Sequence, residues 1–430
     1  MTDEQLLETY FDRLWPICRS ITGPGYRQSL DIISEIMPTD RFKFKTGRKA
    51  FDWTVPKEWV ARDAYLVDPQ GKKRAEFTKN NVHLLNYSVP FQGEMSLEEL
   101  KKNLYSLPDQ PTAIPYLTSY YQERWGFCLT DNELRSLPEG NYKVFIDTEL
   151  KPGHVEVGEA VLPGKEKREI LFSTYLCHPS LANNELSGPL VTALLYQKIK
   201  AMPERRFTYR FAVTPETIGA VCYLTLRGQH LKKVLAAGYQ VTCVGDAGQF
   251  TYKRSRKGNT LADRAALAVL RHQGPHEVLP FTPAMGSDER QYCSPGFDLP
   301  VGSLMRTMYT KYPEYHTSLD NKSAISFKAM SGSVAAYLKV VRAIEANRVW
   351  KNAILFCEPQ LGKRGLYPSL GSQKTIEDRV GAMMWFLNLA DGTRDLLQIA
   401  EDSGQNPELL ASVCEDLSKA ALVKKQTEVR

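Results

Sequence analysis

The sequence lacks long apolar runs, paired cysteines and a large excess of one charge. Its 430 residues include eight cysteines, at positions 18, 128, 177, 222, 243, 293, 357 and 414, and no two of them form a C-x-x-C pair. This spacing argues against a cysteine-type zinc site and a dense disulfide framework, and it predicts reduced, mostly buried thiols. The first residues are acidic, and no run approaches the roughly 18 apolar residues of a membrane span. We therefore expect a cytoplasmic protein with no membrane partner.

Charge and composition are close to those of ordinary globular proteins. The chain has 55 Lys and Arg against 49 Asp and Glu, a formal net charge of +6. An excess this small does not by itself indicate nucleic acid or an anionic membrane as a partner. Hydrophobic residues make up 43% and charged residues 24%, which excludes a disordered or fibrous chain. At about 100 to 200 residues per domain, the length predicts a protein of several domains.

Strand and helix patterns alternate through the middle of the chain. Strand-like apolar runs lie at 169–177, 209–213, 240–244 and 300–304, and helix-like runs lie at 189–200, 260–271 and 327–346. This alternation predicts an α/β domain in which helices sandwich a mixed, mostly parallel sheet. Two amphipathic segments, around 6–14 and 27–37, add two helices near the start. We assign residues 1–44 and 131–350 to this domain.

Two other segments have a different texture. Residues 45–130 combine aromatic and β-branched runs with Pro, Gly and Asn turns, which predicts a β-rich inserted domain. Residues 371–430 show the spacing of a winged helix-turn-helix. Such folds often bind DNA, but this segment contains seven basic and ten acidic residues, a net charge of −3. We therefore expect an interaction or packing module and no nucleic-acid partner.

Four segments place polar side chains directly after strand-like runs, and they carry His178, Glu216, Asp246 and His316. Open α/β sheets place their ligands at the carboxyl ends of the strands. Two imidazoles and a carboxylate at one rim would give zinc three protein ligands and an open position for water. A nearby Glu would take a proton from that water. Taken singly, each residue is better explained as a structural His, a helix cap or a salt bridge.

The residues around these positions form ordered motifs that resemble the zinc aminopeptidase superfamily, which includes glutamate carboxypeptidase and glutaminyl cyclases. The motifs are H-P-S-L-A-N-N-E-L-S-G, P-E-T-I-G-A, G-D-A-G, G-S-D-E-R-Q-Y and Y-H-T-S-L-D. More narrowly, almost the whole chain resembles the aminopeptidase-like proteins encoded beside polysaccharide or secondary-metabolite biosynthesis genes. The segments C-R-S-I-T-G-P-G and G-S-D-E-R-Q-Y-C-S-P-G-F-D-L-P-V-G-S-L-M-R-T are part of this narrower resemblance.

The resemblance implies a role for each site residue. His178, Asp246 and His316 correspond to zinc ligands, and Asn184 stands where a bridging ligand is expected. Glu216 corresponds to the carboxylate that activates water, and Asp288 to a group beside the metal.

Three departures from the superfamily pattern weaken a two-metal site. Asn184 replaces a bridging Asp, and Thr217 replaces the second of two adjacent glutamates. H-P-S also replaces H-x-D, which removes a carboxylate that would support the site. We therefore expect one zinc ion per chain at most, and loss of catalysis is an alternative. A shifted loop that presents Glu185 to the metal would compensate in part.

Arginines and tyrosines near the predicted site loops are candidates for substrate capture. A guanidinium fork suits a carboxylate or a phosphate, and tyrosines would wall a pocket. The substrate-binding residues that we favour are Arg290, Arg306, Tyr309 and Tyr315, with Arg256 and Tyr312 beside them. Solvated arginines and tyrosines packed in a core explain the pattern equally well.

Three functions stay open on the sequence. The first is a zinc-dependent amide-bond hydrolase that acts on a small aminoacylated or peptide-like biosynthetic intermediate, with Glu216 moving the proton. The second is an aminopeptidase-like shell retained as a noncatalytic binding scaffold, which the changes at Asn184 and Thr217 favour. The third is acyl transfer or cyclisation at a single zinc, which needs a closed pocket that excludes water. A symmetric dimer also stays open.

Overall fold

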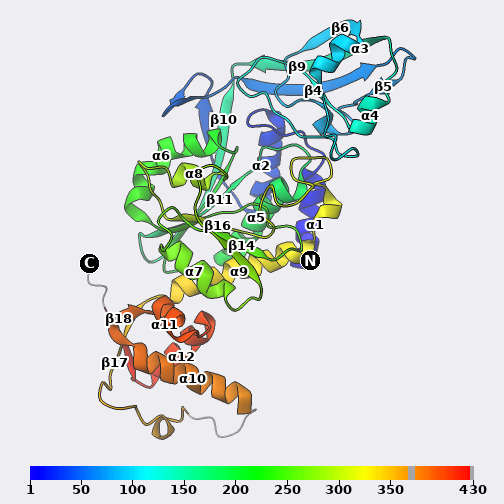
Figure 1. Ribbon diagram of the computed structural model, residues 1–430. Coiled ribbons are helices and arrows are strands. Elements are labelled where there is room, and N and C mark those ends of the chain that lie inside the picture. The colour runs from blue at the N-terminus through cyan, green and yellow to red at the C-terminus, as the bar shows by residue number, and fades with distance from the viewer. Residues whose placement is uncertain (367–372, 427–430) are drawn as a thin grey trace. The chain divides into compact units, whose positions relative to one another are not determined.

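The computed structural model describes residues 1–366 and 373–426, which belong to two compact units (Figure 1). The first unit comprises Met1–Gly258 and Val278–Val334, and the second comprises Asn259–Glu277 and Ala335–Arg430. The expected boundaries at 44, 130, 350 and 371 stay predictions. Residues 371, 372 and 427–430 of the predicted winged-helix segment lie outside the described residues.

An eight-stranded sheet forms the centre of the first unit, in the order β1-β10-β12-β11-β13-β16-β14-β15. The four inner strands β12, β11, β13 and β16 are parallel to one another, whereas β10 pairs with β1 and β12, and β14 with β16, in the antiparallel sense. The strands are β1 (Asp40–Lys45), β10 (His154–Leu162), β11 (Glu169–Tyr175), β12 (Thr208–Thr214), β13 (Leu235–Gln240), β14 (Phe250–Lys253), β15 (His276–Leu279) and β16 (Val301–Met305). This mixed sheet with a parallel centre confirms the predicted α/β class.

Helices cover both faces of this sheet, so β11 is buried along its whole length, as central strands of parallel sheets are. Figure 1 shows α1, α2 and α5 on one side and α6 and α8 on the other. These helices are α1 (Asp3–Leu14), α2 (Pro24–Ile36), α5 (Ser187–Lys200), α6 (Ile218–Val234) and α8 (Glu289–Tyr292). The expected strand at 240–244 is wrong, because β13 ends at Gln240 and Cys243 has a φ of 49°, which a strand does not allow.

A second sheet of the first unit, in the order β5-β4-β9-β6, forms the β-rich segment. Its strands are β4 (Glu58–Val67), β5 (Lys73–Arg74), β6 (Phe91–Ser96) and β9 (Asn141–Lys151), so the sheet continues past residue 130. Short pairs β2 (Lys49–Ala50) with β3 (Trp53–Thr54) and β7 (Leu104–Tyr105) with β8 (Phe127–Cys128) accompany it, as do helices α3 (Leu97–Leu100) and α4 (Asp131–Arg135). Side chains of this segment, such as Leu66 and Tyr142, share one hydrophobic core with Cys177 and Ile218. The β-rich segment is therefore part of the first unit.

The second unit contains the winged helix-turn-helix expected from the sequence. Its helices are α7 (Leu261–Leu270), α10 (Gln373–Leu389), α11 (Leu396–Ser403) and α12 (Pro407–Lys419), and α9 (Phe327–Ala346) runs into it. Its sheet has the order β18-β17-β19, with β17 (Val349–Asn352), β18 (Asp391–Asp395) and β19 (Val423–Lys425). Asp395 and Asn406 cap the first turns of α11 and α12 through their side chains, which explains where both helices start.

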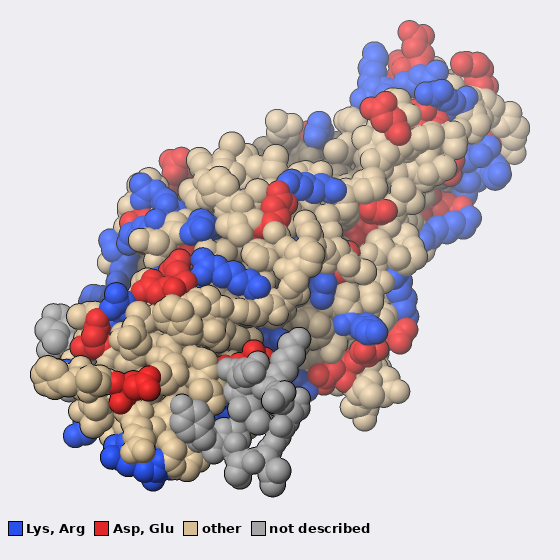
Figure 2. Space-filling model, turned by 60° about the horizontal axis from the view of Figure 1, so that its bottom comes forward, with Lys and Arg blue, Asp and Glu red and all other residues tan. Residues whose placement is uncertain are grey.

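Cysteines and charged groups in the structure agree with the composition. All eight cysteines are unpaired and six of them are buried. No helix within residues 1–366 and 373–426 is long and apolar enough to cross a bilayer. Figure 2 shows basic and acidic side chains interspersed on the face that it presents. In the second unit, Arg394 pairs with both Asp391 and Asp402, and the expected absence of a nucleic-acid partner stays a prediction.

Candidate active site

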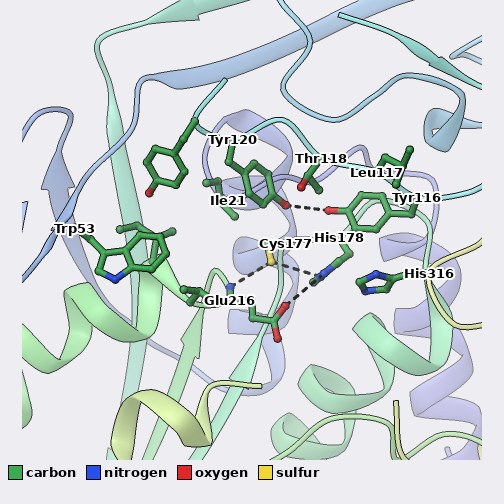
Figure 3. Close-up of a pocket in the computed structure, with 13 residues that line it drawn as sticks. Ile21, Trp53, Tyr116, Leu117, Thr118, Tyr120, Cys177, His178, Glu216 and His316 are labelled. Atoms are coloured by element: carbon green, nitrogen blue, oxygen red, sulfur yellow. Dashed lines mark hydrogen bonds and ion pairs between the residues drawn. The ribbon is translucent and has the colours of Figure 1, made fainter. Parts of the chain in front are cut away.

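His178 lies just beyond the carboxyl end of β11, where the sheet places its ligands. Its side chain is buried, and its carbonyl oxygen accepts a hydrogen bond from Arg19 Nε at 3.1 Å. Its ring Nδ1 lies 2.6 Å from Glu185 Oε2. Its Nε2 lies 3.5 Å from Glu216 Oε2, a contact that Figure 3 shows. The carboxylate at Nδ1 favours a proton on that nitrogen, so Nε2 is the unprotonated nitrogen and faces Glu216.

Glu185 supplies the supporting carboxylate that the H-P-S motif lacks. It is fully buried in a π-helical turn, Ala182–Leu186, and meets His178 from the ring edge opposite Nε2. Arg19, also fully buried, lies behind it with Nε 4.0 Å from Glu185 Oε1. From the sequence, Glu185 was expected only as a metal ligand, and Arg19 was not expected at the site. A charged residue inside the C-R-S-I-T-G-P-G motif was the available signal.

Glu216 follows β12 and is presented by a strained turn at the start of α6. Thr217 has φ 61° and ψ −75°, and Ile218 N–H donates to Glu216 O at 2.8 Å. These values describe a positive-φ γ-turn, which is rare for residues with a side chain. Asp288 Oδ1 accepts the Thr217 N–H at 2.7 Å. Asp288 is fully buried and contacts the backbone that presents Glu216, so its position fits a supporting group.

The two oxygens of Glu216 have different surroundings. Oε1 accepts a hydrogen bond from Ser287 Oγ at 2.8 Å, and Oε2 is the atom that faces His178. Burial raises the pKa of the Glu216 carboxyl, although His178 and Ser287 act in the opposite direction. Burial also raises the pKa of Asp288 well above its ordinary value, and the nearby charge of Glu216 adds to this effect. Oε2 is therefore the oxygen of Glu216 that is directed at His178, while Oε1 is held by Ser287.

A buried ion pair supports the loop that carries Ser287. Glu289 Oε2 accepts the Ser287 N–H at 3.0 Å, and Glu289 Oε1 lies 2.8 Å from Lys253 Nζ. The side chains of Lys253 and Glu289 are 1% and 0% exposed. This ion pair was not predictable from the sequence, because its two residues lie 36 positions apart.

His316 lies in a loop and has a positive φ of 54°. Its ring stacks on that of Tyr315, with ring centroids 4.0 Å apart. Its ring centroid lies 5.3 Å from that of His178. Burial and the neighbouring His178 lower the pKa of His316 to about 3. Its Nε2 is buried and has no hydrogen-bond partner among the described residues. A neutral imidazole with an unpaired nitrogen is what a zinc ligand requires.

The side chains of His178, Glu216 and His316 line one cavity of about 510 Å³ (Figure 3). The β-rich segment supplies one wall, formed by Trp53, Tyr116, Leu117, Thr118, Tyr120 and Tyr121, and the remaining lining residues are Ile21, Cys177, Thr217 and Ile218. The ring of Tyr116 meets both imidazoles, with centroids 5.1 Å from His178 and 5.3 Å from His316. The sequence did not indicate that these residues would line the cavity, because the turn-rich stretch that contains them has no periodic pattern.

Hydrogen bonds join this wall to the loop of His316. Tyr116 N–H donates to His316 O at 2.8 Å, and Ser318 N–H donates to Ile114 O at 2.9 Å. Ser318 Oγ in turn accepts the N–H of Ile114 at 3.0 Å. The wall and one of the two imidazoles are therefore held in register.

Asp246, predicted as a metal ligand, is satisfied by other partners. Its Oδ1 accepts from Gly248 N–H at 2.6 Å and Thr307 Oγ1 at 2.7 Å. Its Oδ2 accepts from Thr307 N–H at 3.1 Å and Asn183 Nδ2 at 2.9 Å. These four bonds use the acceptor sites of a carboxylate. Asp246 does not line the cavity.

Asn184 is also not part of the cavity lining, since its Nδ2 donates to Tyr175 Oη at 2.7 Å. Within the described part of the chain, Cys177, His178 and Glu185 form the group whose ligand atoms lie within 4.8 Å of one another. Cys177 and Glu185 both approach His178 at Nδ1, however, and burial raises the pKa of the Cys177 thiol well above its ordinary value. We favour the Nε2 side of His178 as the metal-facing side.

The predicted substrate-binding residues do not line this cavity. The Arg306 guanidinium donates to Ser333 Oγ, Gly248 O and Ala329 O, so it is tied to the protein interior. Tyr309 packs in an apolar cluster with Met305. The other two of these four residues touch the site from outside the cavity. Tyr315 stacks on His316, and Arg290 Nε donates to Ser287 O at 3.2 Å.

Two families match this chain. Residues 8–347 match the family described as "Domain of unknown function (DUF4910)", and residues 348–425 match a winged helix-turn-helix family. A protein of Clostridium acetobutylicum, named "Putative polysaccharide biosynthesis protein with aminopeptidase-like domain", is 42% identical over 414 residues, which cover 96% of this chain and 94% of that protein.

Solved structures show the same fold. A crystal structure described as "putative peptidase" from Clostridium acetobutylicum has a TM-score of 0.92 at 40% identity, over 98% of this chain and 96% of that chain. BSAP, a zinc aminopeptidase from Bacillus subtilis, has a TM-score of 0.56 at 11% identity, over 79% of this chain and 93% of its own. The likeness to BSAP shows the fold alone. Together these similarities confirm the predicted aminopeptidase-like fold and its C-terminal winged helix.

Proposed function

Because the chain belongs to the DUF4910 family and has an aminopeptidase-like fold, we propose that it is a zinc-dependent amide-bond hydrolase. The observation that carries this proposal is the convergence of His178, Glu216 and His316 on one cavity. The substrate that we propose is a small amide-bearing biosynthetic intermediate. The name of the Clostridium relative, which places that protein in polysaccharide biosynthesis, supports this substrate class.

The donor set fits one zinc ion. His178 Nε2 and the unpaired His316 Nε2 would hold it, with the Glu216 carboxylate beside it. Zinc sites with catalytic function usually have three protein ligands, and the third residue expected here, Asp246, is satisfied elsewhere. We therefore expect an ion that a chelator removes easily. When bound, zinc supplies a Lewis acid for the amide carbonyl and a water of lowered pKa.

The chain's own residues position and move the proton. Glu216 Oε2 accepts the proton that the attacking water loses and delivers it to the nitrogen of the leaving amine. Ser287 holds Oε1, so the free oxygen keeps one direction. Glu185 holds the ring of His178 from Nδ1, as carboxylates behind metal-binding histidines do.

The test combines metal content with turnover in three variants. We expect about one zinc per chain in the wild type, and loss of zinc in His178→Ala and His316→Ala. Glu216→Gln should keep the zinc and lower the hydrolysis rate by a factor of about 10² to 10⁴, because the Gln side chain cannot accept the proton from water. The control is His272→Ala, which removes an exposed histidine outside the cavity. Zinc loss in Glu216→Gln would make Glu216 a ligand instead of the proton acceptor.

A noncatalytic binding scaffold is the second candidate, and the saturation of Asp246 favours it. A carboxylate with four hydrogen bonds gives no ligand to a metal without rearrangement. This candidate requires that the wild type take up no zinc, even when zinc is supplied at neutral pH. Stoichiometric zinc that depends on both histidines would exclude it.

A further inference from the structure

The aromatic wall of the cavity includes two rings that are not buried by the protein. Trp53 and Tyr121 are 38% and 54% exposed, and their centroids lie 5.9 Å apart. Figure 3 shows Trp53 on the cavity side opposite His316. Tyr121 Oη donates to Thr54 O at 3.4 Å, which ties it to the strand that carries Trp53. The two rings thus form one exposed aromatic surface.

This aromatic surface is held in place before any ligand binds. The β2–β3 hairpin that carries Trp53 is anchored at its tip, where Phe51 packs edge-on against Phe297 at 5.6 Å. On the other side, Tyr120 packs against Tyr87 at 5.3 Å. Large aromatic side chains held rigid and partly exposed beside a cavity are typical of ligand contacts, because little entropy is lost on binding.

The cavity offers no charged partner to a ligand group that lies against its aromatic wall, because no residue of that wall has a charged side chain. Its thirteen lining residues, all of them described, include no Lys or Arg, and Glu216 is the one acidic residue among them. Glu216 already meets Ser287 and His178, and His178 already meets Glu185. An ammonium or carboxylate group held against this wall would lose its water without gaining a counter-ion, which is unfavourable.

We propose that the cavity binds an uncharged ring of the substrate against Trp53 and Tyr121. This inference rests on the proposed function and narrows its substrate to amides whose group in the cavity carries neither an ammonium nor a carboxylate. In that reaction the water oxygen bonds to the carbonyl carbon, the C–N bond breaks, and the amine leaves with a proton from the water. An aryl ring and the apolar face of a pyranose present the same chemistry to this wall.

Matched neutral and charged probes test the proposal by binding. We would titrate full-length Glu216→Gln and wild-type protein with 3-phenylpropanamide and with phenylalaninamide, which differ by one α-amino group. The second pair is methyl glucoside and methyl glucosaminide. At about pH 6 the amines are mostly charged, and we expect each neutral probe that binds to bind at least about tenfold tighter than its ammonium partner. The pair that binds identifies the ring as aryl or glycosyl.

Variants locate the binding. Trp53→Leu and Tyr121→Ala should each weaken the neutral probe about tenfold, whereas Trp385→Ala should leave it unchanged. Trp385 is an equally exposed tryptophan on α10 that does not line the cavity. Two results overturn the proposal: an ammonium probe that binds as tightly as its neutral partner, or neutral probes whose affinity is insensitive to both Trp53 and Tyr121.

Turnover separates this inference from the proposed function. Neutral probes that bind through Trp53 to a wild type that hydrolyses no amide would refute the hydrolase and leave the subsite standing. Hydrolysis that depends on Glu216 but prefers a free α-ammonium, measured on 3-phenylpropanoyl and phenylalanyl p-nitroanilides, would support the hydrolase and refute the neutral subsite.

Discussion

Two acidic loops follow neighbouring regions of the same sheet, and their carboxylates have very different surroundings. Glu216 follows β12, sits next to a backbone turn with positive φ, and has an oxygen that faces an imidazole. Asp246 follows β13, and both its oxygens are used by hydrogen bonds from Asn183, Gly248 and Thr307. Strain and an incompletely used carboxylate mark the first loop, and full satisfaction marks the second.

The surroundings of the two carboxylates indicate which of them can take part in proton transfer at the carboxyl ends of the strands. A carboxylate that accepts four hydrogen bonds stabilises its loop, and moving it toward a metal would cost those bonds. A carboxylate with a raised pKa and one directed oxygen is prepared to exchange a proton. Position after a strand is common to both residues, so position alone does not separate them.

The largest effect is expected when the buried Lys253–Glu289 ion pair is broken, because this pair supports the loop whose Ser287 holds Glu216. Lys253→Met should destabilise the protein by about 3 to 5 kcal/mol, because Glu289 would be left as an unpaired buried charge. Denaturant unfolding measures this change. The double variant Lys253→Met with Glu289→Leu should recover part of the loss, since no buried charge remains. A single variant as stable as the wild type would show that the pair does not support the loop.

Asp246 is expected to stabilise its loop and not to bind zinc. Asp246→Asn should lower the free energy of unfolding by about 1 to 3 kcal/mol, because an amide nitrogen cannot accept the bonds that Oδ2 receives. Zinc content should stay unchanged. Thr307→Val, which removes one donor to Oδ1, is the matched control and should cost less. Zinc loss in Asp246→Asn with unchanged stability would reverse the comparison and return Asp246 to the metal site.

The smallest effect is expected at Glu185, which acts through His178. Glu185→Gln should weaken zinc binding or activity about 10- to 100-fold, the usual range for groups behind a metal ligand. Zinc affinity measured against a competing chelator gives the answer. Glu185→Ala should be worse than Glu185→Gln, because Gln still accepts a hydrogen bond from Nδ1–H. Equal affinity in all three proteins would refute the positioning role.

The sequence predicted the parts of the fold that repeat at short range. The helix expected at 327–346 coincides with α9, and β11 delivers His178 at its carboxyl end as predicted. Both depend on local hydrophobic periodicity, which is legible in one chain. The strand expected at 240–244 failed because a single positive-φ residue, Cys243, ends the extended conformation.

His178, His316, Glu216 and Asp288 were named together from the sequence, and the structure brings them to one site. The role of Asp246 as a metal ligand stays a prediction, and the sequence did not show its hydrogen-bond partner Thr307, which lies 61 positions away. Glu185 was expected at the metal only through a shifted loop, because an ordinary helical turn would direct its side chain away. The π-helical turn adds a residue to the turn and changes that direction. Spacing rules based on 3.6 residues per turn do not anticipate such an insertion.

The backbone link between 114–116 and 316–318 has a consequence for the order of events during synthesis. The aromatic wall is complete early, but Tyr116 finds its hydrogen-bond acceptor only when His316 has left the ribosome, some 200 residues later. Until then the cavity lacks both an imidazole and the contact that sets the register of its wall. A chain truncated before His316 would therefore lack this contact, and the two imidazoles would come together only late in synthesis.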